Sequence, residues 1–154
     1  MKRTNKAFVI ILIALLYSIP IISFICLRTY HKMHKSYGPG LTVHLPKTWN
    51  AGDRNSSNSD GTCTINMNMT TRDIDRIKEE MIPYEMEYTE KKIKDVSMQY
   101  GYMETEDEII HTYIFKHPTI DKNYYLIYTQ NRNSEAEDCK EFINQIEDRL
   151  VIEY

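Results

Sequence analysis

Hydrophobic and polar positions alternate in several short segments of the chain. The alternation is clear in residues 41–45, 62–69 and 94–104. Side chains of a strand point alternately to its two faces, so this pattern predicts half-buried strands. Residues 108–116 and 123–130 are apolar at both parities, which is typical of strands covered on both faces. We therefore expect a sheet that lies between two layers.

A helix is expected directly after the second of these strands. Thr70 or Thr71 is placed to act as its N-cap, with Asp73 in the first turn. Pro83 is expected to end or kink it. Its apolar stripe consists of Ile74, Ile77 and Met81.

A second helix is expected to close the chain. Ser134 and Glu137 stand three positions apart, the spacing of a capping box. Apolar residues then recur at helical intervals at Cys139, Phe142, Ile143, Ile146 and Leu150. Residues 50–61 contain one apolar residue, Ala51, and are predicted to form a loop. Residues 84–90 are compatible with either a helix or a strand.

The predicted order is strand, strand, helix, three strands, helix. Short turns join the three late strands, so these strands should pair antiparallel. We expect an α+β fold: an N-terminal transmembrane helix, then an antiparallel β-sheet flanked by two helices. The α+β domain is assigned to residues 41–154, which is one domain's length of chain.

An uncharged, mostly apolar run of 21 residues, 7–27, precedes the domain. About 20 apolar residues cross a bilayer as a helix. The run ends in bulky residues rather than a small-x-small site, which favours a retained single-pass anchor over a cleaved signal. Residues 1–6 form a short head, and residues 28–40 form a basic juxtamembrane linker. Lysine and arginine flank both ends, and we expect the head in the cytoplasm and the domain outside.

The net charge of −3 averages two opposite parts of the 154-residue chain. Residues 1–35 hold six Lys and Arg and no acidic residue, whereas residues 36–154 carry a net charge of −9. An acidic domain disfavours nucleic-acid binding, which requires a basic face. It favours a protein partner, in particular a basic one, and it speeds their encounter. The basic flanks are suited to the membrane surface.

A short motif and the element order suggest a family. The first strand ends in Leu45-Pro46, Trp49 follows as an expected core residue, and a helix, a tyrosine-rich meander and an amphipathic helix complete the chain. This arrangement resembles the Mog1/PsbP-like fold. The resemblance implies an antiparallel sheet flanked by helices and a binding or assembly-support domain. It implies no catalytic residues.

Two cysteines, Cys63 and Cys139, lie outside the predicted span. One belongs to a predicted strand and the other to the core stripe of the last helix, so contact between them is plausible. In an oxidising compartment they could form a disulfide. The alternative is two buried free thiols, which behave as small hydrophobic groups.

Tyrosine is frequent, with 12 in the chain. Six of them lie on predicted strands of the meander: Tyr100, Tyr102, Tyr113, Tyr124, Tyr125 and Tyr128. A buried tyrosine hydroxyl needs a partner, so an exposed subset beside acidic residues would form a protein-binding surface. The alternative is that tyrosine simply fills sheet positions, which its strand propensity favours.

Catalytic motifs are missing from the sequence. No His-Glu-x-x-His, Gly-x-Ser-x-Gly or phosphate-binding glycine loop occurs. We therefore predict no enzyme activity, no cofactor and no metal site. The expected function is a membrane-anchored binding domain, such as an immunity-type or envelope-accessory protein. Two alternatives are a single-span subunit of a membrane complex and a small hydrolase using His111 or His117 with a carboxylate.

Overall fold

The computed structural model describes residues 17–28, 34–36, 40–52 and 54–154. The chain divides into two compact units, Met1–Lys32 and Met33–Tyr154. In the first unit, residues 17–28 are helical, and the large apolar side chains along them are 57% to 71% exposed. Residues 7–16 of the predicted anchor lie outside the described residues. Within the described ranges, no helix combines the length and the apolar character that crossing a membrane requires.

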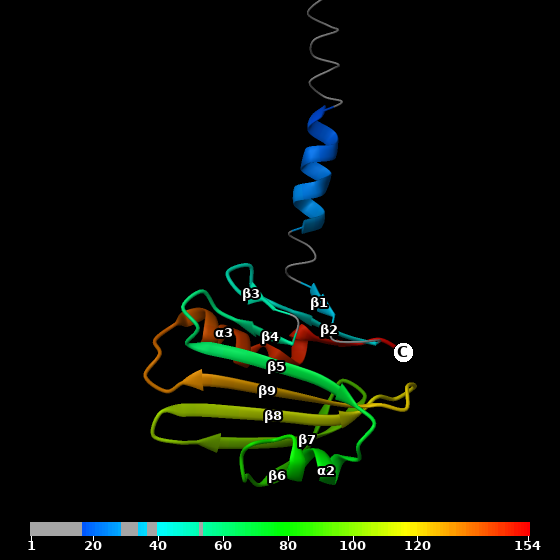
Figure 1. The fold of residues 1–154 in the computed structure, drawn as a ribbon, viewed down its shortest axis with the longest axis vertical. Coiled ribbons are helices and arrows are strands. Elements are labelled where there is room, and N and C mark those ends of the chain that lie inside the picture. Colours follow the sequence, from blue (N-terminus) through cyan, green and yellow to red (C-terminus); the bar gives the residue numbers. More distant parts are fainter. Residues whose placement is uncertain (1–16, 29–33, 37–39, 53) are drawn as a thin grey trace, which may run out of the picture. The chain divides into compact units, whose positions relative to one another are not determined.

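The second unit contains a seven-stranded sheet in which every strand pairs antiparallel with its neighbours (Figure 1). The strand order is β3-β4-β5-β9-β8-β7-β6. The bounds are β3 Asn50–Ala51, β4 Asn55–Ser57, β5 Cys63–Thr70, β6 Tyr88–Ile93, β7 Val96–Glu104, β8 Glu108–Lys116 and β9 Asn123–Asn131. The antiparallel pairing of the three late strands, β7 to β9, is confirmed.

Helices and a smaller sheet complete this unit. The three-stranded sheet has the order β1-β2-β10, with β1 His34–Ser36, β2 Leu41–His44 and β10 Leu150–Ile152. The helices are α2 Ile74–Glu80, α3 Glu137–Asn144 and α4 Ile146–Arg149. Part of the predicted linker therefore contributes a strand. The α+β class and the main antiparallel sheet are confirmed.

The large sheet is covered on both faces, as its two-sided strands predict. On β8, Phe115 belongs to the core against α3, α4 and the small sheet, whereas the adjacent Ile114 belongs to a second core beneath α2. Trp49 is fully buried in the first core, and its ring centroid lies 4.6 Å from that of Phe142. The expectation that Trp49 is a core residue is confirmed.

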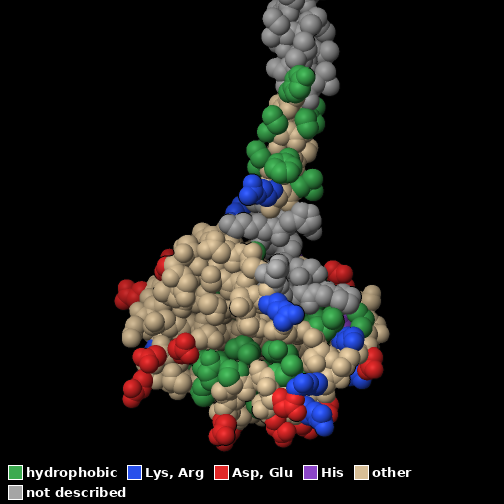
Figure 2. Space-filling model, viewed as in Figure 1, with side chains coloured by type: hydrophobic (Ala, Val, Ile, Leu, Met, Phe, Trp, Pro, Cys, Tyr) green, Lys and Arg blue, Asp and Glu red, His purple; other side chains and the backbone are tan. Residues whose placement is uncertain are grey.

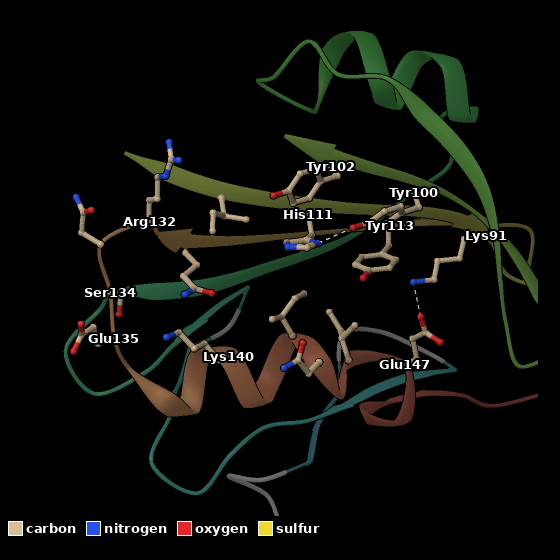
Figure 3. Close-up of a pocket in the computed structure, with 16 residues that line it drawn as sticks. Lys91, Tyr100, Tyr102, His111, Tyr113, Arg132, Ser134, Glu135, Lys140 and Glu147 are labelled. Carbon is tan, nitrogen blue, oxygen red and sulfur yellow. Dashed lines mark hydrogen bonds and ion pairs between the residues drawn. The ribbon is translucent and has the colours of Figure 1, made fainter. Parts of the chain in front are cut away.

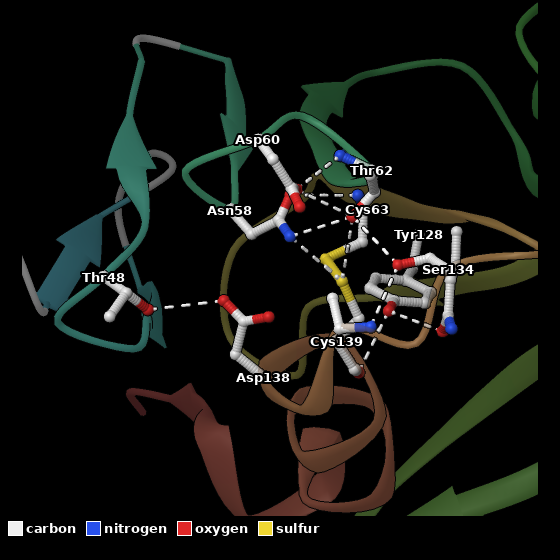
Figure 4. The surroundings of a disulfide bond; sticks show 11 residues. Thr48, Asn58, Asp60, Thr62, Cys63, Tyr128, Ser134, Asp138 and Cys139 are labelled. Carbon is white, nitrogen blue, oxygen red and sulfur yellow. Dashed lines mark hydrogen bonds between the residues drawn. A yellow bond between two sulfur atoms is a disulfide. The ribbon is translucent and has the colours of Figure 1, made fainter.

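A disulfide joins the sheet to the last helix region. Cys63 of β5 and Cys139 of α3 are both fully buried and bonded, with their Cα atoms 6.0 Å apart. Figure 4 shows the polar groups around this bond. The buried Asn58 donates to Cys139 Sγ at 3.3 Å, and its Oδ1 accepts from the backbone N–H of Cys63 at 3.1 Å. The sequence allowed either a disulfide or two buried free thiols, and the structure contains the disulfide.

Residues 50–61 do not form a simple loop as predicted. They contain β3, which pairs with β4, and β4, which also pairs with β5. Backbone groups make these bonds whatever the side-chain polarity, so a polar sequence gave no sign of them. The predicted strand at 94–104 begins only at Val96, because Lys94 adopts φ = 54° in the preceding turn.

The predicted helix caps are both wrong. Asp73, not a threonine, caps α2, because its Oδ1 accepts from the Arg76 backbone N–H at 2.9 Å. Ser134 makes no capping box. Its hydroxyl donates to Thr62 across the disulfide region at 3.0 Å, and Ala136 is the N-cap of α3 without a side-chain hydrogen bond.

The closing helix is shorter than its apolar spacing predicts. It breaks at Gln145, continues as the single turn of α4, and gives way to β10 at Leu150. There, Leu150 pairs with Val43 and Ile152 pairs with Leu41 of β2. Pairing with a distant strand decides the conformation of these last residues, and periodicity does not report it.

Candidate functional site

A groove lies between one face of β7, β8 and β9 and the helices α3 and α4 (Figure 3). It has a volume of about 900 Å³, within the range of ligand-binding clefts. Tyr100, Tyr102, His111 and Tyr113 contribute ring surfaces from β7 and β8. They share one face because alternate residues of each strand point the same way, and the two strands pair in register, with Tyr102 opposite His111.

The imidazole of His111 is central to the aromatic wall. Its Nδ1 lies 2.9 Å from the Tyr100 hydroxyl, and its ring meets the Tyr102 ring edge-on at 5.1 Å. Burial, with the nearby charge of Lys91, lowers the pKa of His111 to about 4. The imidazole is therefore neutral at pH 7, which suits a hydrogen-bonding and stacking role.

The tyrosines of this wall differ in exposure. Tyr102 is 47% exposed, and its hydroxyl donates to Glu104 at 3.0 Å. This hydrogen bond is the main reason why the pKa of Tyr102 is raised. Tyr100 is half-buried beneath the Lys91 ammonium, which lies 5.0 Å from the ring centroid. Burial and, secondarily, the charge of Glu147 raise the pKa of Tyr100, so both hydroxyls stay protonated at neutral pH.

The structure narrows the predicted set of surface tyrosines. Tyr113, Tyr124, Tyr125 and Tyr128 are each less than 10% exposed. They are core side chains and do not belong to an exposed subset, although Tyr113 still lines the groove. Tyr128 shows how burial is tolerated: its hydroxyl lies 3.0 Å from the Cys139 carbonyl and 3.1 Å from Gln130 Oε1. A role in binding stays a prediction for Tyr100 and Tyr102.

Charged side chains stand at both ends of the groove (Figure 3). At one end, Lys91 forms an ion pair with Glu147 at 2.5 Å. Arg132, Ser134 and Glu135 lie at the other end, where Arg132 pairs with Glu104 at 3.0 Å. Lys140 extends from α3 into the space between the helix and the sheet. It makes no ion pair and no side-chain hydrogen bond with any residue that the structure describes.

Among the residues that the structure describes, no carboxylate forms a hydrogen bond with either of the two histidines considered for hydrolysis. His111 bonds to a tyrosine hydroxyl. His117 is buried, its Nε2 lies 3.2 Å from the Gly40 carbonyl, and its Nδ1 accepts from the backbone N–H groups of Thr119 and Ile120. These contacts hold the turn after β8. Over the described ranges, no three His, Cys, Asp or Glu side chains are grouped to hold a metal ion.

Sequence reasoning placed Tyr100 and Tyr102 at the site but missed other residues that line it, on the sheet as well as on α3. Lys91, Gln130 and Lys140 line the groove and were not singled out. The helical spacing of Lys140, Ile143 and Asn144 was available as a signal, because residues three and four apart share one helix face. Gln130 offered none, since it continues the alternation of β9 without standing out.

Comparison with known proteins gives no family for this chain. No protein-family model matches the chain, and no curated protein sequence matches it. A crystal structure of a protein from Bacteroides thetaiotaomicron VPI-5482 at 1.50 Å is similar to it, with a TM-score of 0.48 and 17% sequence identity. The match covers 77% of this chain and 47% of that one, so the chain spans about half its length. Membership of the Mog1/PsbP-like fold stays a prediction.

Proposed function

We propose that this chain is a membrane-tethered, non-catalytic binding domain that captures a protein partner outside the cytoplasm. An immunity-type or envelope-accessory protein is the kind that fits best. The observation that carries the proposal is the groove above Tyr100 and Tyr102. It offers exposed ring surface and charged ends, a combination found at protein-binding sites. The histidine in the groove is neutral and hydrogen-bonded to a tyrosine, which fits binding rather than catalysis.

Tethering rests on the N-terminal part of the sequence. The run at residues 7–27 has the length and composition of a bilayer span. Its described portion is helical with exposed apolar side chains, as expected of a segment that lipid covers. The disulfide supports an extracytoplasmic domain, because such bonds persist in oxidising compartments and are rare in the cytosol.

The charge of the domain supports the choice of partner. Residues 36–154 carry −9, and Figure 2 shows acidic side chains mainly around the border of the face seen there. The field of such a surface attracts a basic protein over distances of about 10 Å at moderate ionic strength. Contact residues in the groove then decide whether the encounter is productive.

A site-specific photo-cross-linker tests this function. It replaces Tyr102 in the full chain in cells, and a matched variant carries it at Ser97, an exposed position whose side chain points to the opposite face of β7. We expect one dominant protein adduct from position 102 and none from position 97. Equal labelling from both positions would contradict a specific groove. If a further variant with the cross-linker in the apolar segment at residues 7–27 were the one that forms adducts, a subunit of a membrane complex would be favoured.

Location is tested separately by adding protease to intact cells. We expect digestion of the domain from outside and protection of the N-terminal head. Protection of the whole domain would place it in the cytoplasm and remove the envelope proposal.

A further inference from the structure

The face of the large sheet that packs under α2 continues beyond the helix, across β9, β5 and β4. Strand register and the alternation of side chains align six residues of this face in two rows: Asn55, Asn66 and Ile127 in one row, and Ser57, Thr64 and Thr129 in the next. Ile127 packs against the core beneath α2, whereas Asn55 and Thr64 are exposed. Figure 2 shows the area over β4 and β5 mostly as uncharged side chains and backbone. This part of the sheet is therefore an open, polar surface.

Asparagine amides on this surface orient one another. Asn66 Nδ2 donates to Asn55 Oδ1 at 2.6 Å, and Asn68 Nδ2 donates to Asn66 Oδ1 at 2.6 Å. Asparagine is depleted in strands, and residues that conflict with local preference are expected mainly at functional sites. In the part of the chain that the structure describes, the Asn55 amide nitrogen and the hydroxyls of Thr64 and Thr129 have no hydrogen-bond partner. These groups are available to a ligand, and the amides among them are held in place.

A hollow with a volume of about 260 Å³ lies among these side chains. Clefts for drug-sized ligands usually have about 300 to 1,000 Å³, so this hollow admits one small ring. Five residues of the two rows line it together with Pro83 and Tyr84, and none of the described residues that line it is charged. The surrounding domain carries −9, so the uncharged lining suits a neutral ligand. A sugar ring combines several hydroxyl groups, an apolar C–H face and no charge, and it matches all three features of the hollow.

We propose that this hollow binds one unit of an uncharged sugar. The sugar hydroxyls form hydrogen bonds with the two amides of the first row and with Thr64 and Thr129. Neighbouring strands lie about 4.8 Å apart, and alternate residues of one strand lie about 6.7 Å apart, so hydroxyls at different positions of one ring reach different side chains. The C–H face of the ring packs on Tyr84, because the face of an aromatic ring carries partial negative charge. The site is separate from the protein-binding groove, which lies on the other face of the sheet, and it goes beyond the proposed function.

Oligosaccharide titrations test the sugar site on the full chain in a polyoxyethylene detergent, because detergents with sugar head groups would compete. Three probes are uncharged: tetraacetylchitotetraose, cellotetraose and maltotetraose. A fourth probe, the tetramer of galacturonate, is anionic and tests whether the exposed Arg54, which precedes β4, selects a charged ligand instead. The side-chain amide NMR signals of Asn55 and Asn66 report occupancy of the hollow.

We expect saturable shifts of these signals with at least one neutral tetramer, with a Kd of about 1 mM or lower. The galacturonate tetramer should bind at least about tenfold more weakly, because nothing in the lining pairs with its carboxylates. Tighter binding of tetraacetylchitotetraose would point to a glycan of amino sugars, whereas tighter binding of a glucose tetramer would point to a glucan. Either preference supports the proposal.

Variants assign the binding to the hollow. Asn66→Thr removes the amide that links its two neighbours and keeps a residue suited to a strand, and Thr64→Val removes one hydroxyl at nearly constant shape. Each should weaken binding of the neutral tetramer about fivefold or more. Thr89→Val is the matched control for Thr64→Val, because Thr89 is an exposed threonine of β6 that does not line the hollow. It should bind as the parent chain does, and far-ultraviolet circular dichroism checks that all three variants fold.

Absence of saturable binding by all three neutral tetramers would overturn the sugar site. Equal binding of the galacturonate tetramer, or of a blocked glycine–serine peptide that offers hydroxyls without a ring, would overturn it as well. So would unchanged binding by both Asn66→Thr and Thr64→Val, or equal weakening by Thr89→Val, since the sugar would then bind elsewhere. None of these results affects the proposed function, which the cross-link from position 102 decides, and loss of that cross-link would leave sugar binding in the hollow unaffected.

Discussion

Reduction of the Cys63–Cys139 bond should strongly destabilise the domain. The two residues are 76 positions apart, so the bond closes a long loop in the unfolded chain. The loss of unfolded-state entropy for a loop of this size corresponds to about 4 kcal/mol at 25 °C. With a urea dependence of about 1.5 kcal/mol per M, the unfolding midpoint should fall by about 3 M when the bond is reduced.

The assay compares urea unfolding of the full chain in a mild detergent with and without a strong reductant. Reduction leaves both sulfur atoms in place, so the comparison isolates the cross-link from the loss of packing that a cysteine substitution would add. Cys26, an exposed free cysteine, serves as an internal standard. Denatured protein should show one reactive thiol before reduction and three after it.

Two results would refute this reasoning. Three reactive thiols without reductant would show that the bond does not form in the native protein. A single thiol combined with a midpoint shift corresponding to less than about 1 kcal/mol would show that the denatured chain is already constrained and that loop entropy is not the source of stability.

Substitutions at three further positions test other parts of the structure. His111 has a lower pKa folded, about 4, than its ordinary value of 6.5, so the unfolded state takes up its proton first and stability is lost as pH falls through this window. His111→Gln should remove about 2 kcal/mol of the loss between pH 7 and 4, after allowance for partial solvent exposure; equal pH slopes in urea titrations would contradict this. Gly40→Ala should cost about 2 kcal/mol or more, because φ is +82° and a Cβ would lie 2.3 Å from His117 Nε2; an unchanged melting temperature would be inconsistent with that crowding. Asp73→Ala should cost about 1 kcal/mol by removing the cap on Arg76 N–H, and Asp73→Asn should retain most of the stability in the same measurement.

Periodicity predicted the centre of the large sheet well. The segment 108–116 was assigned as a strand with the bounds that β8 has, and its two-sided apolar pattern correctly indicated cover on both faces. Such a pattern reports on local geometry, because successive side chains must leave a strand on opposite sides. The turn at 105–107 between β7 and β8 likewise depends on residues that are close neighbours in the chain.

The candidate site was only half predictable. Tyr100 and Tyr102 were singled out with four tyrosines that are buried, since sequence shows that a residue suits a strand but not which stretch of that strand is covered. The opposite wall, with Lys140, comes from a helix more than 30 residues away.

By itself, the sequence determined the α+β class, the central antiparallel strands, the opposite charges of the two parts of the chain and the single long apolar run. These follow from spacing and composition, which act between near neighbours. Only the tertiary structure decided that residues 150–152 pair with β2, that Cys63 and Cys139 bond, and that a groove opens beside α3. Each of these joins segments far apart in the chain, and their meeting depends on how the whole core packs rather than on any local pattern.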